Sequence, residues 1–126
     1  MTTNRRILVV EDDDISQFLI KKMLENLSFD VTMASNGIEA LEILDENLFD
    51  IILMDIEMPV ISGFETVRRI QNGKYKAEIK NIPIIGISAN PFENEKETYY
   101  IQGLRDYITK PISQEELSEK INSILM

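Results

Sequence analysis

Acidic residues follow two short apolar runs of this chain, and their types and positions suit chemistry. Glu11 and Asp12 come directly after residues 7–10, and Asp55 comes directly after residues 51–54. If both runs are strands of one sheet, these carboxylates lie together at one edge and repel each other. A divalent cation such as Mg²⁺ relieves the repulsion, because it prefers oxygen ligands. We therefore expect Asp12 and Asp55 to bind a metal ion, with Glu11 beside them.

Asp55 differs from an ordinary surface acid in its surroundings. Four apolar residues precede it, so it is expected to project from a buried strand. A carboxylate in that position can attack phosphorus and form an acyl phosphate. A bound cation would shield the charges of the carboxylate and of the incoming phosphoryl oxygens. Asp55 is therefore a candidate phosphoacceptor.

Two further polar residues are expected at the same edge. Ser88 ends an apolar run and offers a hydroxyl donor, and Lys110 offers a positive charge whose direction is fixed by Pro111. Each also has an ordinary explanation, as a strand-end serine and as a solvated lysine. Asp13 and Asp14 have an ordinary explanation, because either one could be the N-cap of the next helix. As a set, a nucleophile, cation ligands, a lysine and a hydroxyl are the parts that phosphoryl transfer requires.

The elements that must position these residues alternate between apolar runs and amphipathic stretches. Strands are expected at residues 7–10, 29–35, 51–54, 82–88 and 107–109. Helices are expected at residues 15–27, 38–44, from 63, 93–102 and from 114, with a polar loop at 71–81. Ser62 with Glu65, and Ser113 with Glu116, have the spacing of capping boxes. Strands separated by helices pair in parallel, so we predict an α/β fold, an open doubly wound sheet that binds ligands at its carboxyl edge.

Composition limits the classes of function. The 126 residues fit one compact domain, and we expect 1–126 to be a single domain. The absence of cysteine excludes disulfides and thiolate zinc sites, and the absence of histidine excludes a phosphohistidine relay within the chain. A net charge of −9 argues against nucleic-acid binding. No apolar run is long enough for a signal peptide core or a membrane span, so we expect a cytoplasmic protein with no membrane partner.

Four segments, in order, resemble the receiver domain of response regulators in two-component signalling. They are Ile7-Leu8-Val9-Val10-Glu11-Asp12-Asp13, Met54-Asp55-Ile56-Glu57-Met58-Pro59 with Gly63, Ile84-Ile85-Gly86-Ile87-Ser88-Ala89-Asn90, and Tyr107-Ile108-Thr109-Lys110-Pro111-Ile112. The resemblance covers essentially the whole chain from residue 7. The local sequence after the fourth expected strand and at the fifth is most similar to receivers of hybrid histidine kinases. It implies a flavodoxin-like five-stranded parallel sheet in the order 2-1-3-4-5 with five helices.

The resemblance also implies roles at the metal site. Asp55 would be phosphorylated, and Asp12 and Asp55 would bind Mg²⁺ (or Mn²⁺) through their side chains. Glu11 would act mainly through water, and Glu57 would add its backbone carbonyl. The side chain of Glu57 also places a further carboxylate at the mouth of the site, where it is expected to alter cation affinity or phosphate lifetime.

Further roles concern the phosphoryl group and the output. Lys110 and Ser88 would bind the phosphoryl oxygens, with Ser88 standing where threonine is more frequent. Ser88 and Tyr107 would move together after phosphorylation and change the surface of the fourth expected helix, the fifth strand and the last helix. The bond between Lys110 and Pro111 is often cis in this family.

The implied function is a phosphoacceptor switch of a phosphorelay. Its donor would be a histidine kinase or a histidine phosphotransfer domain, and its output an unknown downstream protein. The chain would not be an enzyme beyond self-catalysed phosphoryl transfer and autodephosphorylation. Two alternatives remain: a Mg²⁺-dependent phosphohydrolase with Glu57 as general acid, and a non-phosphorylated binding module whose acids only solvate the edge.

Overall fold

The computed structural model describes residues 4–89 and 103–125, which contain one five-stranded sheet. All neighbouring strands pair in parallel, in the order β2-β1-β3-β4-β5. The strands are β1 (Arg6–Val10), β2 (Asp30–Ala34), β3 (Ile51–Asp55), β4 (Ile84–Ser88) and β5 (Asp106–Thr109). The predicted strand order and the doubly wound fold are therefore confirmed.

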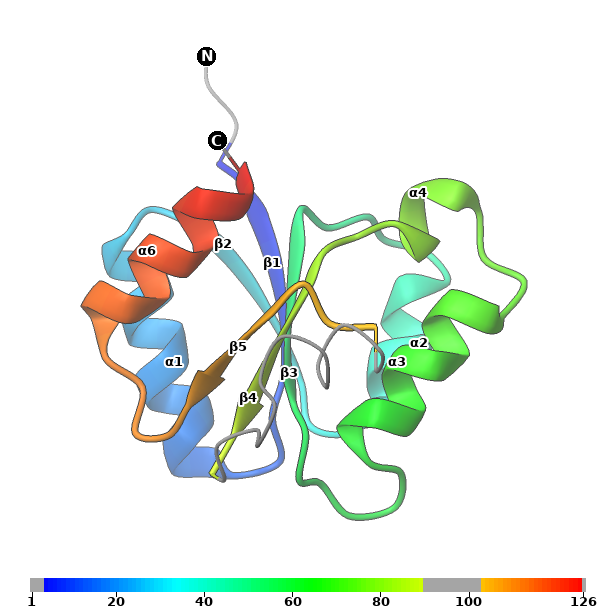
Figure 1. The fold of residues 1–126 in the computed structure, drawn as a ribbon, viewed down its shortest axis with the longest axis horizontal. Helices are drawn as coiled ribbons and strands as arrows, with labels where there is room; N and C mark the ends of the chain where they lie inside the picture. The colour runs from blue at the N-terminus through cyan, green and yellow to red at the C-terminus, as the bar shows by residue number, and fades with distance from the viewer. Residues whose placement is uncertain (1–3, 90–102, 126) are drawn as a thin grey trace.

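Helices cover both faces of the sheet. Figure 1 shows α1 (Asp14–Asn26) and α6 (Gln114–Leu125) on one side, and α2 (Gly37–Leu44), α3 (Gly63–Asn72) and α4 (Ala77–Lys80) on the other. The helix expected at 93–102 lies outside the described residues. None of the helices within 4–89 and 103–125 has the length and apolar character needed to cross a bilayer.

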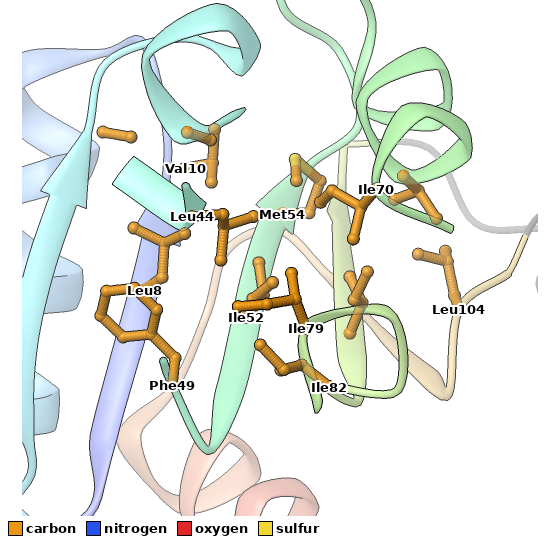
Figure 2. Close-up of a cluster of buried hydrophobic side chains, with 14 of the residues drawn as sticks. Leu8, Val10, Leu44, Phe49, Ile52, Met54, Ile70, Ile79, Ile82 and Leu104 are labelled. Atoms are coloured by element: carbon orange, nitrogen blue, oxygen red, sulfur yellow. The ribbon is translucent and has the colours of Figure 1, made fainter. Parts of the chain in front are cut away.

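The prediction of a polar loop at 71–81 was wrong at both ends. Helix α3 continues to Asn72, and α4 adds a short helix within the segment. The physical reason is Ile79, which is 9% exposed and packs into the core, so one apolar residue anchors a mostly polar turn. Figure 2 shows Ile79 among the core side chains, together with Ile52 and Ile82.

The central strands are buried on both faces. Alternate side chains of a strand point to opposite faces, so β1 and β3 contribute to two separate apolar clusters. One cluster contains Leu8, Val10, Ile52 and Met54, and the other contains Ile7, Val9, Ile51 and Leu53. Neither face of β1 or β3 is solvated, and this explains why both strands are continuous apolar runs. Burial on both faces also places them at the centre of the sheet.

Serine caps hold the beginnings of two helices. Ser62 Oγ accepts a hydrogen bond from the amide of Glu65, and Ser113 Oγ accepts one from the amide of Glu116, each at 3.1 Å. The side chain of Glu65 bonds to Arg69 at 3.0 Å and also to Arg68. The spacing therefore predicted both helix starts correctly, because an N-cap satisfies amides that lack helical partners.

Candidate functional site

Three carboxylates meet where β1 and β3 end. Val10 pairs with Met54 across the two strands, so Glu11 and Asp55 follow at the same edge. Carboxylate oxygens of Glu11, Asp12 and Asp55 all lie within 4.8 Å of one another. Glu11 and Asp55 are 0% and 1% exposed, whereas Asp12 is open to solvent. The edge thus combines two buried acids with one accessible acid.

Lys110 opposes the charge of the two buried acids. Its Nζ lies 3.3 Å from Oε1 of Glu11 and 3.7 Å from Oδ2 of Asp55. Burial works against the ammonium charge, but the carboxylates of Asp55 and then Glu11 outweigh it, so the pKa of Lys110 is raised. One ammonium therefore pairs with two buried acids, and Asp12 adds a third carboxylate, so the acids outnumber the ammonium at this edge.

Burial raises the pKa of Asp55 from 3.8 to about 8, and the neighbouring Glu11 carboxylate adds to the rise. Lys110 and the amide of Glu57, which donates to Asp55 Oδ1 at 3.1 Å, act in the opposite direction. Without a cation, Asp55 therefore holds its proton more tightly than an ordinary aspartate.

The acids fit a divalent cation. Oε1 of Glu11 is buried and has no hydrogen-bond partner among the described residues, although it forms an ion pair with the Lys110 ammonium at 3.3 Å. A buried carboxylate oxygen left in this way costs free energy. A hard cation held by Asp12 and Asp55 would satisfy the clustered oxygens, which is the ligand chemistry that Mg²⁺ prefers.

Asp13 has a different role from its neighbours. Its side chain accepts a hydrogen bond from the amide of Ser16 at 2.8 Å, and it is the N-cap of α1. Hydrogen bonding by Ser16 holds the pKa of Asp13 below its ordinary value. The prediction that Asp13 caps the helix is confirmed, and Asp14 lies in the first turn of α1.

Ser88 ends β4 and contacts Glu57 across the edge. Its Oγ donates to Oε2 of Glu57 at 2.8 Å, and the amide of Ala89 donates to Oε1 of the same carboxylate, also at 2.8 Å. Sequence reasoning placed Glu57 at the mouth of the site but missed this contact. The two segments are 31 residues apart, and no local signal connects them.

Tyr107 lies on β5, which is separated by β4 from the strand that carries Asp55. It pairs with Gly86 of β4, two residues before Ser88 pairs with Thr109. Its half-buried ring packs against the core, and Lys120 Nζ lies 5.6 Å from the ring centroid. The structure therefore places Tyr107 on β5, the strand that pairs with the β4 strand of Ser88.

The loops around Asp55 approach each other closely. The amide of Gly63 donates to the carbonyl of Ile56 at 3.0 Å, and a Cβ at Gly63 would lie 2.3 Å from the carbonyl oxygen of Asp55. Only glycine fits where α3 begins so near the end of β3. The amide of Lys110 donates to the carbonyl of Ser88 at 2.8 Å, and the bond to Pro111 is cis, as the resemblance implied.

An apolar surface borders the site on α1. Ile15, Phe18 and Leu19 are 71%, 61% and 49% exposed, whereas Ile20 and Leu24 face the core. A groove of about 410 Å³ continues from this helix to the loop after β5, lined by Ser16, Leu19, Ile20, Met23, Lys110, Pro111 and Ile112. Lys110 borders both the groove and the acids, so the apolar surface adjoins the charged edge.

The chain is similar to proteins of a known family. The family model described as the response regulator receiver domain matches residues 7–122. The chain belongs to this family. Its members are the phosphoacceptor switches of two-component signalling.

Several curated relatives are sensor kinases. Hybrid signal transduction histidine kinase I of Dictyostelium discoideum is 40% identical over 124 residues, which cover 94% of this chain and 7% of the kinase. The chain spans 7% to 17% of the first such relatives. Protein PilH of Pseudomonas aeruginosa is 35% identical and is matched over 97% of its length, with 95% of this chain covered.

Two solved structures are close in fold. The receiver domain of a sensor histidine kinase from Pseudomonas aeruginosa has a TM-score of 0.86 and 31% identity, covers 98% of each chain, and has a magnesium ion coordinated in its active-site cleft. Response regulator protein TrrA from Thermotoga maritima, in complex with Mg²⁺ and beryllium fluoride, has a TM-score of 0.80 and 31% identity, over 95% of this chain and 98% of that one.

Proposed function

We propose that Asp55 accepts a phosphoryl group from a phosphohistidine donor and that the chain is a single receiver domain over residues 1–126. The observation that carries the proposal is the meeting of Glu11, Asp12, Asp55 and Lys110 at one strand edge, where Glu11 and Asp55 are both buried. A nucleophile beside clustered acids and a single ammonium is the arrangement that acyl-phosphate formation requires.

The metal in this proposal is Mg²⁺ (or Mn²⁺). Asp12 and Asp55 would bind it through their carboxylates, Glu11 would act mainly through water, and Glu57 would supply its backbone carbonyl. When bound, the cation neutralises the charges of the acids and of the phosphoryl oxygens. The buried oxygen of Glu11 without a hydrogen-bond partner supports this assignment.

The reaction needs Asp55 in its charged form. Burial and Glu11 oppose ionisation, while Lys110 and the amide of Glu57 favour it. An oxygen of Asp55 attacks phosphorus and forms a new P–O bond, the P–N bond to the donor imidazole breaks, and its electron pair stays on the imidazole. Lys110 and Ser88 then donate hydrogen bonds to the phosphoryl oxygens.

The donor has to be another domain, because this chain contains no histidine. We propose a histidine kinase or a histidine phosphotransfer domain, since several relatives are hybrid or sensor kinases. The exposed Ile15, Phe18 and Leu19 beside the site offer an apolar surface on which such a domain can dock. We place the protein in the cytoplasm.

The output in this proposal runs through Ser88 and Tyr107. When Ser88 bonds to the phosphoryl group, Tyr107 on the neighbouring strand follows, and the surface of β5 and α6 changes for a downstream protein. The pairing of β4 with β5 supports this route, because it joins Ser88 and Tyr107 through two adjacent strands. A net charge of −9 disfavours nucleic acid as that partner. Beyond its own phosphorylation and dephosphorylation, the domain is proposed to have no enzymatic activity.

One experiment tests the function. The protein is incubated with Mg²⁺ and acetyl phosphate, and its intact mass is measured for the wild type, for Asp55→Asn, and with Mg²⁺ removed by EDTA. We expect one added phosphoryl group in the wild type with Mg²⁺ and none in the other two samples. No adduct with Mg²⁺ bound would instead indicate a binding module, and rapid turnover of phosphate esters would indicate a phosphohydrolase.

A further inference from the structure

The side chain of Glu57 bridges two segments at the mouth of the site. One of its oxygens accepts from the Ser88 hydroxyl and the other from the Ala89 amide, both at 2.8 Å. Both donors belong to the end of β4, whereas Glu57 follows β3. The carboxylate therefore ties the ends of these two neighbouring strands together in the unphosphorylated protein.

One of these donors is the hydroxyl proposed above to bind the phosphoryl group, and the other is the next amide along the chain. Ser88 is 4% exposed and is proposed above to bind a phosphoryl oxygen, and the Ala89 amide follows it directly. A hydroxyl and an amide each carry one hydrogen to donate. Because both hydrogens point to Glu57, they are unavailable to a phosphoryl oxygen until the carboxylate leaves.

The Glu57 side chain resembles the incoming group in its chemistry. A carboxylate offers two negatively charged oxygens that accept charge-assisted hydrogen bonds, as a phosphoryl group does. Glu57 is exposed, and its amide is held by Asp55 Oδ1 at 3.1 Å. Its side chain can thus rotate into solvent while its backbone stays in place, and two anions will not share the same donors.

We propose that the Glu57 carboxylate is an internal competitor of the phosphoryl group, occupying the Ser88 and Ala89 donors until phosphorylation of Asp55 displaces it. The inference rests on the proposed function for the identity of the incoming group. It gives the Glu57 side chain a role separate from its backbone carbonyl. Glu57 opposes capture of the phosphoryl group and holds the end of β4 in its resting position.

The test measures binding of beryllium fluoride, a phosphoryl mimic, by isothermal titration calorimetry at saturating Mg²⁺. Removing the competitor in Glu57→Ala should tighten binding about tenfold, the order expected for charge-assisted hydrogen bonds at an exposed position. Glu57→Gln keeps an acceptor but loses the charge, so a smaller gain of about threefold is expected. Asp14→Asn removes one charge near the same edge without touching Ser88, and it should bind like the wild type.

A double-mutant cycle separates competition from a general charge effect. If Glu57 acts by occupying the Ser88 hydroxyl, the gain from Glu57→Ala should shrink at least threefold in a Ser88→Ala background. An equal gain in both backgrounds would overturn the competition for Ser88. A wild type that binds beryllium fluoride as tightly as Glu57→Ala would overturn the inference while leaving the proposed function standing.

A second measurement does not depend on any phosphoryl mimic. Amide hydrogen exchange at Ala89 in the free protein should be several-fold faster in Glu57→Ala than in the wild type, because the amide loses its acceptor. Unchanged exchange would show that the contact is absent in solution and would also overturn the inference. If no variant binds beryllium fluoride, the wild type included, the proposed function fails and the competition fails with it.

Discussion

Replacing Asp55 by asparagine should make the metal-free protein more stable at alkaline pH. Asparagine keeps the shape of the side chain and its acceptor for the Glu57 amide, but it carries no charge into the buried site. The substitution removes the free-energy cost of burying the Asp55 charge and of its repulsion by Glu11. The loss is the attraction to Lys110, whose Nζ lies 3.7 Å away.

The magnitude follows from the shift in pKa. Because the pKa of Asp55 is raised in the folded state, the stability that this group contributes is full below its unfolded value of 3.8 and is lost as pH rises towards about 8. At pH 8 the corresponding upper limit is about 5 kcal/mol. Water entry and movement of Lys110 lower this figure, so we expect a gain of about 2–3 kcal/mol for Asp55→Asn.

Urea unfolding in EDTA at pH 5 and pH 8 measures the difference directly. The gain at pH 5 should be about one third of that at pH 8, because the free-energy cost of Asp55 grows with the distance of the pH above its unfolded pKa of 3.8. Added Mg²⁺ should stabilise the wild type more than the variant. Asp14→Asn, a matched exposed acid, should change the free energy of unfolding by less than about 0.5 kcal/mol at either pH. A variant that is less stable than the wild type at pH 8, or equally stabilised at both pH values, would refute the reasoning.

Three further predictions concern single residues. Val60 has a φ of 74°, which strains a β-branched residue, and its side chain is 82% exposed. Val60→Asn should therefore raise the free energy of unfolding, measured in urea, by about 1 kcal/mol. A lower free energy of unfolding in this variant would contradict backbone strain at Val60. Gly63→Ala should lower the free energy of unfolding by about 2 kcal/mol or more and slow phosphorylation by acetyl phosphate, because the new Cβ meets the backbone of Asp55. Unchanged stability and an unchanged phosphorylation rate would show that α3 can move away. Tyr107→Ala should leave phosphorylation of Asp55 intact, as measured by mass, but reduce the phosphorylation-induced change in amide exchange of α6. Abolished phosphorylation in that variant would contradict its role in the output.

Local and repeating signals were sufficient to predict a parallel, doubly wound sheet and the helix starts, whereas the strand order was implied by the family resemblance. Apolar runs separated by amphipathic stretches leave few topologies, and the caps at Asp13, Ser62 and Ser113 depend on residues only three positions apart. The same logic brought Glu11 and Asp55 to one edge, because the carboxyl ends of parallel strands coincide there. These features follow from periodicity and geometry that a single sequence contains.

Features that depend on distant contacts were not predictable in this way. Helical spacing identified α1 but did not tell which apolar stripe is buried, and the structure buries Ile20 while exposing Phe18. The turn at Ile79 forms because the core accepts one isoleucine from a polar segment. The bond between Glu57 and Ser88 depends on a side-chain rotamer and on the approach of two loops, neither of which leaves a pattern in the sequence.

The central claim is that Asp55 is the phosphoacceptor, and locating the phosphoryl group tests it most directly. After incubation with Mg²⁺ and acetyl phosphate, borohydride reduction converts an acyl phosphate of aspartate into homoserine, which peptide mass spectrometry then identifies. The account predicts homoserine at position 55 and unreduced Asp12 and Glu11, with no conversion when Mg²⁺ is withheld. Conversion at another acid, with Asp55 unchanged, would contradict it.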